Sequence, residues 1–376
     1  MKKCKWRILE NETKYCCKKL WEKCVEIQNE IGVSASYGHA PLYSYPGILT
    51  MYAGAQAAKA LDDDKLLEEV NSYLELYPFR FEEPGIKFAY NFDNYRVGGL
   101  GKAWMFMKGY FKDHENVIRE YAEMTLVAPK SSDGIMCDRR WPELEKIWVD
   151  VVYAVCPFML FAGLSLKEPR YVDFAVDQCF KMYDAFIDKS NGLLHQARGF
   201  MGDKTTLSHD HWSRGNGWGI IGLVEIVRYI PKEHPKYDEA CKRLYNHCAS
   251  LIKFQTERGL WKQSIAERLA WEESSGTGLI LYAIGIGLRV GVLDKETFME
   301  PFKRGIEGLY QFCIEDDYSV TRGCHGCLCP GLGDKKGTIE AYLVDVTHVK
   351  NDSHAFGPII LAMTEAERNG IGNIVK

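Results

Sequence analysis

Two aspartates stand near the beginning of apolar stretches and carry side chains suited to proton transfer. Asp150 begins an apolar stretch that runs to Leu160, and Asp93 comes shortly before the glycine-rich stretch that starts at Gly98. A carboxyl group in a cleft can donate or accept a proton during catalysis. An aspartate at the start of a helix is also a common N-cap, whose oxygen accepts a backbone N–H. The sequence leaves both roles open for each aspartate.

The strongest local pattern is the segment 209–218, His-Asp-His-Trp-Ser-Arg-Gly-Asn-Gly-Trp. Gly215 and Gly217 would let the backbone turn sharply before the next helix. Such a turn would present three side chains around one point, namely Trp212, Arg214 and Trp218. Arg214 suits a carboxylate ligand, because a guanidinium binds carboxylates through paired hydrogen bonds. An ion pair between Asp210 and Arg214 is the alternative.

Three further candidates lie before or at the start of other apolar stretches: Tyr45, Trp148 and His195. Aromatic faces pack well against sugar rings, and a histidine can hold or move a proton near neutral pH. We expect these side chains to join the segment 209–218 in binding an anionic sugar. The alternative is structural, with the tryptophans in the core and His195 as a hydrogen-bonded residue of a loop.

A unit of two helices recurs along the chain, and each unit has an apolar stretch paired with an amphipathic one. The apolar stretches begin near Gly47, Gly98, Asp150, Trp218, Thr277 and Phe356. The amphipathic stretches are 12–31, 65–76, 115–124, 171–186, 237–255 and 295–312. A helix that is apolar on all faces is buried, whereas an amphipathic helix covers it from outside.

The connections contain glycines followed by apolar residues, which predict short extended segments at one rim. These segments are 85–86, 134–136, 192–194 and 259–261. We therefore expect an all-α protein with a single domain over residues 1–376. Its predicted fold is an (α/α)6 barrel, or six-hairpin toroid, with short extended segments in the rim loops. An open solenoid of helical pairs is the alternative.

Charge, hydropathy and cysteine content limit the partners and the compartment. Lys and Arg number 47 against 51 Asp and Glu, with the signs interspersed, so nucleic acid is not an expected partner. No apolar run has the length of a membrane span, and the N-terminus lacks a secretory signal pattern. The 13 cysteines are scattered through helical patterns, which is typical of reduced thiols. We expect a cytoplasmic protein that does not bind membranes.

One cluster of thiols has the spacing of metal ligands: Cys324-His-Gly-Cys-Leu-Cys329. The Cys-His-Gly element resembles the zinc site of lanthionine cyclase-like proteins, but the Trp-Cys-x-Gly element that supplies another thiolate there is not found. A short cysteine cluster without a second half is weak evidence for zinc. Inert thiols, a metal site and a catalytic thiol all remain open.

Several motifs together resemble one family. They are Ile147-Trp-Val-Asp150, Gly192-Leu-Leu-His195, Trp212-x-Arg214-Gly-Asn-Gly-Trp218, Gly259-Leu-Trp-Lys-Gln263, Glu273-Ser-Ser-Gly-Thr277 and Phe356-Gly-Pro-Ile-Ile-Leu361. From roughly Tyr43 to the C-terminus, the chain is similar to the unsaturated rhamnogalacturonyl hydrolases of glycoside hydrolase family 105. These enzymes are related to the unsaturated glucuronyl hydrolases of family 88.

The resemblance implies an (α/α)6 barrel without a metal or organic cofactor. It implies release of a terminal 4,5-unsaturated uronic acid from a small oligosaccharide left by a polysaccharide lyase, most typically a rhamnogalacturonan disaccharide. Asp150 would be the general acid and base, and Asp93 the second acidic residue. The residues expected to grip the unsaturated sugar are His195, Trp212, Arg214 and Trp218, joined by Trp148 and Tyr45. We expect a monomer or a homodimer.

The chemistry expected of such an enzyme requires an acid that is still protonated near neutral pH. We therefore predict that the pKa of Asp150 is raised by a partly desolvated pocket and by Asp93. Other functions remain as alternatives. The same barrel could carry an ordinary glycosidase, or a sugar epimerase that uses His209 and His211, or a non-catalytic scaffold that binds carbohydrate or zinc.

Overall fold

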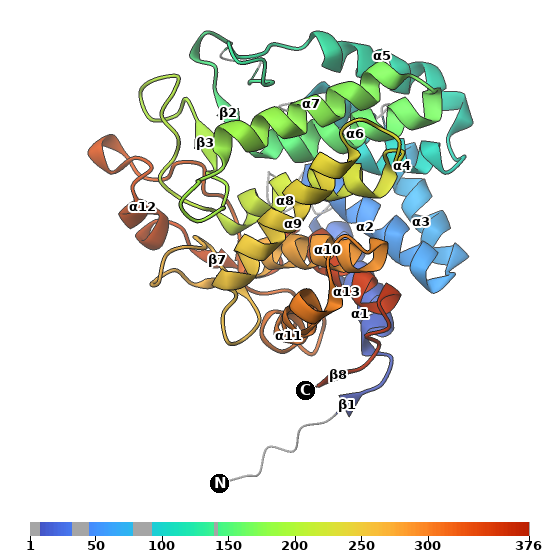
Figure 1. The fold of residues 1–376 in the computed structure, drawn as a ribbon. Helices are drawn as coiled ribbons and strands as arrows, with labels where there is room; N and C mark the ends of the chain where they lie inside the picture. Colours follow the sequence, from blue (N-terminus) through green and yellow to red (C-terminus); the bar gives the residue numbers. More distant parts are fainter. Residues whose placement is uncertain (1–7, 32–44, 78–91, 139–141, 376) are drawn as a thin grey trace.

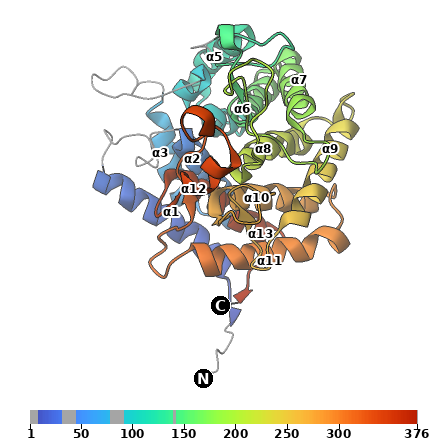
Figure 2. The same cartoon turned by 90° about the vertical axis from the view of Figure 1, so that its left-hand side faces the viewer.

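A computed structural model describes residues 8–31, 45–77, 92–138 and 142–375 of the chain. Within these ranges most residues are helical, and the helices form two concentric layers (Figures 1 and 2). The inner helices are α2 (Tyr45–Leu61), α4 (Gly99–Met107), α6 (Asp150–Leu166), α8 (Ser213–Tyr229), α10 (Ser274–Val290) and α13 (Ser353–Arg368). The outer helices are α1 (Glu12–Ile31), α3 (Asp64–Glu75), α5 (Glu115–Val127), α7 (Pro169–Phe186), α9 (Tyr237–Leu251) and α11 (Lys295–Cys313).

The inner helices form a closed ring. Each packs against the next in the order α2, α4, α6, α8, α10 and α13, and α13 packs against α2. Each outer helix lies against an inner partner, and α1 covers α13, so the first hairpin of the chain closes on the last one (Figure 2). The predicted six-hairpin toroid is confirmed and the open solenoid is wrong. Closure follows from burial, because an inner helix such as α6 exposes no apolar face that could end a solenoid.

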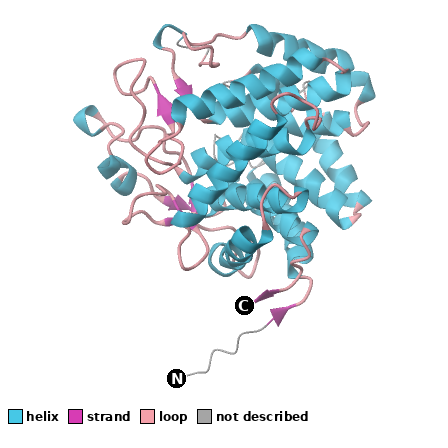
Figure 3. Cartoon of the chain, in the orientation of Figure 1, coloured by secondary structure: helices cyan, strands magenta, loops and turns pink. Residues whose placement is uncertain are grey.

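The other elements are short and lie mostly at one end of the ring (Figure 3). The strands are β1 (Ile8–Leu9), β2 (Ile147–Trp148), β3 (Ala197–Arg198), β4 (Trp261–Lys262), β5 (Glu272–Glu273), β6 (Gly323–Cys324), β7 (His348–Val349) and β8 (Ile374–Val375). The remaining helices are α12 (Ile339–Val344) and the 3-10 helices η2 (Asp93–Val97), η3 (Lys112–His114), η4 (Pro142–Leu144), η5 (Ile252–Phe254) and η6 (Gly333–Lys335).

Antiparallel strand pairs order the loops that precede the inner helices: β2–β3 joins the loops before α6 and α8, whereas β4–β5 lies within the loop before α10. Trp148 in β2 pairs with Ala197 in β3, and Trp261 in β4 pairs with Glu273 in β5. Away from these strands, at the bottom of the view, β1 pairs with β8, which brings the two chain ends together (Figure 1). The predicted extended segments are therefore present as two-residue strands and isolated bridges, except for segment 85–86, which lies outside the described residues.

In the described ranges, no helix is long and apolar enough to cross a lipid bilayer.

The glycines of segment 209–218 have a different role from the predicted one. The helix α8 begins at Ser213, so Gly215 and Gly217 lie inside the helix rather than in a turn before it. A Cβ on Gly217 would lie 2.7 Å from the side chain of Leu279. A glycine without a side chain allows the two helices to approach closely. The prediction of a sharp turn was therefore wrong, and these glycines serve the packing of α8 in the ring.

The contact between α10 and α13 provides a test of this packing. Gly278 faces the backbone of Pro358, and an added Cβ would lie 2.6 Å from the Pro358 carbonyl carbon. We expect Gly278→Ala to destabilise the fold by about 1–3 kcal/mol, because backbone atoms cannot move aside as a flexible side chain can. The measurement is the midpoint of thermal and urea unfolding. Gly326→Ala is the control, since a Cβ there meets no atom within 4 Å; equal midpoints for the two variants would contradict the packing argument.

Candidate active site

Asp150 lies in the first turn of α6, directly after the rim strand β2 and Val149. The N-cap of α6 is Val149, which makes no side-chain cap. True acidic caps occur elsewhere in the ring: Glu273 caps α10 by accepting the backbone N–H of Ser275 at 2.8 Å. Asp150 is therefore not the N-cap that its position first suggested. Its half-buried carboxyl group faces a different environment from that of a cap.

Burial raises the pKa of Asp150 from its ordinary value to about 7. The positive charge of Arg214 opposes this rise, and so does a hydrogen bond with the backbone of Asp150 itself. Desolvation disfavours the ionised form of a carboxyl group, which explains the direction of the net shift. The predicted rise in the pKa is confirmed. Its expected second source is not found, because Asp93 is not among the groups that shift it.

Arg214 is fully buried on α8, and its guanidinium group is held in place by three kinds of contact. It donates to the hydroxyl of Ser275 at 3.0 Å and to the backbone carbonyl oxygens of Cys324 and His325. Its Cζ atom lies 4.4 Å from the ring centre of Trp212. The cation is therefore fixed near Asp150 by contacts with neutral groups, while the neighbouring charges of Glu273 and Asp352 also help to keep it protonated.

The expected alternative for Arg214 was an ion pair with Asp210. Among the described residues, Asp210 instead accepts the backbone N–H of Trp212 at 3.1 Å and lies near the hydroxyl of Tyr342. Burial raises the pKa of Asp210 to about 6. The ion-pair interpretation is wrong in this structure. One face of the Trp212 ring is covered by Arg214.

Aromatic rings pack beneath the start of α6. Trp218 is fully buried and stacks on Tyr153 with 4.3 Å between the ring centres. Tyr45 meets Trp218 edge to face at 6.4 Å and stacks on Tyr95 at 5.9 Å. Tyr153 lies one helical turn after Asp150, and its own pKa is raised by burial and by the neighbouring charges of Tyr77 and Asp150. Aromatic packing of this kind excludes water from the base of the site.

Sequence reasoning missed Tyr153 and Tyr95 as members of this aromatic group. A signal existed for Tyr153, because residues three positions apart share one face of a helix. Tyr95 follows Asp93 by two residues in the 3-10 helix η2. That spacing does not by itself distinguish a site residue from a core residue, since both tyrosines fit equally well in an apolar core.

A buried chain of hydrogen bonds also ends at Tyr45. The hydroxyl of Tyr45 lies 2.8 Å from Nε2 of His354, and Nδ1 of His354 lies 2.6 Å from Oδ1 of Asp352. Burial lowers the pKa of His354 to about 4, so the ring is neutral near pH 7. An ionised carboxylate only accepts hydrogen bonds, so Nδ1 donates to Asp352 and Nε2 accepts from Tyr45. Asp352 and His354 were not predicted, although both lie at the start of the last inner helix.

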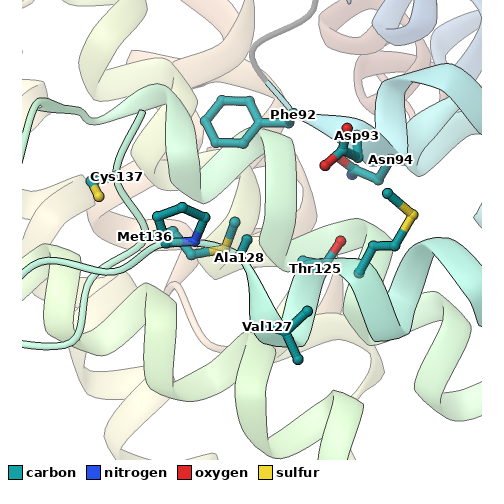
Figure 4. A pocket seen from close by; sticks show the side chains of 10 residues that line it. Phe92, Asp93, Asn94, Thr125, Val127, Ala128, Met136 and Cys137 are labelled. Carbon is teal, nitrogen blue, oxygen red and sulfur yellow. The ribbon is translucent and has the colours of Figure 1, made fainter. Parts of the chain in front are cut away.

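Of two other candidates, Asp93 lines a cavity and Trp148 packs against Phe92 in the wall of that cavity. Asp93 is half-buried at the start of η2 and lines a cavity of about 370 Å³ with Phe92, Asn94 and residues from the end of α5 to Cys137 (Figure 4). Trp148 is buried in β2, and its ring centre lies 6.5 Å from that of Phe92. The structure thus places Trp148 between the start of α6 and the wall of the cavity that contains Asp93.

His195 belongs to a separate group at the rim. Its Nδ1 lies 2.7 Å from the carbonyl oxygen of Ser208, and its ring centre lies 4.8 Å from that of His211. His195 is not among the groups that shift the pKa of Asp150. The structure therefore brings together Asp150, Arg214, Trp218 and Tyr45, but it groups His195 with His211 and with Asp188.

The thiols of the segment 324–329 are buried. Burial raises the pKa of Cys327 well above its ordinary value and that of Cys329 to about 11. Protonated, buried thiols are poor nucleophiles and poor metal ligands. In the described part of the chain, the side chains that converge as a group of three possible ligands are those of Asp188, His195 and His211, and none of these cysteines is among them. The interpretation as inert thiols fits the structure best.

Comparison with known proteins finds relatives among enzymes that act on unsaturated uronic acids. It is 22% identical over 183 residues to an unsaturated 3S-rhamnoglycuronyl hydrolase of Alteromonas sp., covering 48% of this chain and only 43% of that relative. It is also 22% identical over 253 residues to the unsaturated rhamnogalacturonyl hydrolase YesR of Bacillus subtilis, covering 64% of this chain and 70% of YesR. The chain thus spans less than half the length of the Alteromonas relative.

The fold has close counterparts among solved structures. A possible member of glycoside hydrolase family 105 from Salmonella enterica superposes with a TM-score of 0.80 at 18% identity, covering 96% of this chain and 95% of that one. This likeness shows that the same toroid occurs there. A family model extends the evidence from fold to sequence, because the model described as Glycosyl Hydrolase Family 88 matches residues 18–370. Since that match covers nearly all of the sequence, the chain belongs to Glycosyl Hydrolase Family 88.

Proposed function

We propose that this protein removes a terminal 4,5-unsaturated uronic acid from lyase-generated oligosaccharides by hydration of the C4=C5 bond. The observation that carries the proposal is the carboxyl group of Asp150, whose pKa of about 7 keeps much of it protonated near neutral pH. A carbon atom is a weak base, so protonating it requires such an acid at close range. The names of the Alteromonas and Bacillus relatives support this substrate class.

The reaction begins with transfer of a proton from Asp150 to C4 of the enol ether. The resulting cation at C5 is stabilised by the ring oxygen. Water then adds at C5 and returns a proton to the Asp150 carboxylate, which restores the acid. The product of this step is a hemiketal, whose ring opens and releases the remaining sugar together with a 5-keto-4-deoxyuronate. One carboxyl group therefore serves as acid and then as base, whereas an ordinary glycosidase uses two.

Arg214 is well placed to bind the carboxylate of the uronic acid. It is fully buried, and its hydrogen bonds go to a hydroxyl and to backbone carbonyl oxygens rather than to a carboxylate. In the part of the chain that the structure describes, three buried N–H donors of the expected site lack an acceptor: Nε of Arg214, Nε1 of Trp212 and Nε1 of Trp218. Buried donors are normally paired. An anionic sugar rich in oxygen atoms would supply acceptors.

The other predicted residues receive more distant roles in this proposal. The cavity beside Asp93 and Trp148 would contact the leaving sugar, and a rhamnogalacturonan disaccharide remains the substrate we expect first. His195 would contact the sugar from the rim. We further propose a single-domain, cytoplasmic enzyme that acts as a monomer or homodimer, since the cysteines of the described residues are free thiols.

The role of Asp150 is tested by Asp150→Asn. An amide cannot donate the proton, so we expect turnover to fall by about a hundredfold to ten-thousandfold. The measurement is the loss of ultraviolet absorbance of the conjugated alkene in a panel of lyase-generated disaccharides. Asp238→Asn, an exposed carboxyl group on the outer helix α9, is the matched control and should retain activity. Turnover near that of the wild type in Asp150→Asn, with an unchanged melting temperature, would rule out the assignment.

The pKa of Asp150 predicts how the rate depends on pH. Because the protonated form is the reactive one, kcat/KM should be level below pH 7 and fall by about tenfold per pH unit above it. The profile should be the same in Asp238→Asn. A falling limb close to the ordinary pKa of an aspartate would show that Asp150 is not raised, or that it is not the acid.

The hydration step can be separated from ordinary hydrolysis in deuterium oxide. Proton transfer from an enzyme group to C4 should place a single deuterium there, on one face only, at the earliest times of the reaction. Proton NMR of the product measures this directly. Ordinary hydrolysis would first release an unsaturated sugar, whose spontaneous tautomerisation would deuterate both faces of C4. A mixture of the two epimers from the start would therefore contradict hydration.

A further inference from the structure

We propose that Asp188, His195 and His211 form a binding site for a divalent transition-metal ion, with Zn²⁺ as the ion that fits best. The three residues come from the loop after α7, the segment before β3 and the segment before α8. Their ligand atoms all lie within 4.8 Å of one another. The proton-transfer steps at Asp150 do not involve this group, although His195 is also the residue proposed to contact the sugar from the rim.

The distances are close to those of a metal site. Nε2 of His211 lies 3.1 Å from Oδ2 of Asp188. Two ligands of a tetrahedral Zn²⁺ ion, each 2.0–2.1 Å from the metal, are about 3.3 Å apart. This pair therefore already has the required separation. Since no ligand atom is more than 4.8 Å from another, His195 would need to move by only about 1.5 Å to complete the set.

The hydrogen bonds around the ligands prepare them for a cation. A carbonyl oxygen only accepts, so Nδ1 of His195 donates its proton to Ser208 and leaves the lone pair on Nε2. On the other side, Oδ1 of Asp188 accepts the backbone N–H of Ser190 at 2.8 Å and its hydroxyl at 2.6 Å. Metal-binding histidines and carboxylates are typically held by such outer contacts, which fix the tautomer and the direction of each ligand.

The charges at the cluster also favour a cation. In the described ranges Asp188 forms no ion pair with a lysine or arginine, and its charged contact is with His211. The cluster offers a divalent cation one carboxylate oxygen and two imidazole nitrogens.

The types of ligand decide which metal is expected. Ca²⁺ and Mg²⁺ prefer sites made of oxygen ligands. Two imidazole nitrogens and one carboxylate suit Zn²⁺ and neighbouring transition metals, and three protein ligands leave a fourth position for water. Such an ion would tie three rim segments together. It would also fix the position of His195. The next residue, Gln196, accepts the backbone N–H of Val149 through its carbonyl oxygen, and Val149 immediately precedes Asp150.

The test is titration of metal-depleted protein with Zn²⁺ by calorimetry and with Co²⁺ by visible absorption, which detects tetrahedral nitrogen and oxygen ligands. We expect one ion for each chain. Affinity should fall by about tenfold or more in His211→Asn and in Asp188→Asn. His209→Asn is the matched control, because His209 is exposed and lies two residues from His211 outside the cluster. The control should bind as the wild type does.

The thiols of the segment 324–329 are tested by Cys327→Ser, which should bind the ion normally. The proposal is wrong if the wild type binds no stoichiometric ion, or if His211→Asn and Asp188→Asn bind as tightly as the wild type. It is also wrong if binding is lost only in Cys327→Ser. Melting temperatures measured without metal show whether the ligand variants remain folded. If Asp188→Asn is unfolded, the comparison of His211→Asn with His209→Asn decides the question.

Discussion

The structure depends on one constraint, which is that every inner helix must bury all of its faces. Such helices have no exposed side on which the array could end, so the ring must close. Close approach of the backbones makes this possible. A Cβ on Gly222 of α8 would lie 2.8 Å from the carbonyl oxygen of Val152 in α6, and one on Gly276 of α10 would lie 2.4 Å from the backbone of Ser213. The starts of neighbouring inner helices are thereby brought together at one rim.

The same close packing gives Asp150 its chemical character. Its carboxyl group is partly desolvated beside Arg214, and the balance between burial and that cation leaves the pKa at about 7. Glu225 offers a useful contrast, because it is also buried in the ring. Glu225 accepts a hydrogen bond from Tyr52 at 2.8 Å and another from Tyr282, and Arg228 lies 3.7 Å away. Partners of this kind make Glu225 structural, whereas within the described ranges the carboxyl group of Asp150 is influenced by the Arg214 cation and by the backbone of Asp150 itself.

The sequence was sufficient to predict the helices, but it was not sufficient to predict the side-chain contacts across the ring. Apolar and amphipathic stretches predicted the inner and outer helices closely, since periodicity reports burial directly. The glycines of α8 were misinterpreted, because glycine serves both tight turns and close packing and the sequence does not distinguish them. Asp188, Asp352 and His354 were missed for another reason. Each has one partner in a distant segment, namely His211 for Asp188, His325 for Asp352 and Tyr45 for His354, and such pairs become visible only in the folded structure.

One hydrogen bond contributes both to closure of the ring and to the shape of the site. Tyr45 opens the first inner helix, and its hydroxyl bonds to His354 at the start of the last one. Asp352, which fixes His354, also caps α13 by accepting the backbone N–H of His354 at 2.9 Å. The last hairpin therefore does more than cover the first. It sets the direction of the Tyr45 hydroxyl beside Trp218, so a chain that ended before α13 would lose the shape of the site together with the closure of the barrel.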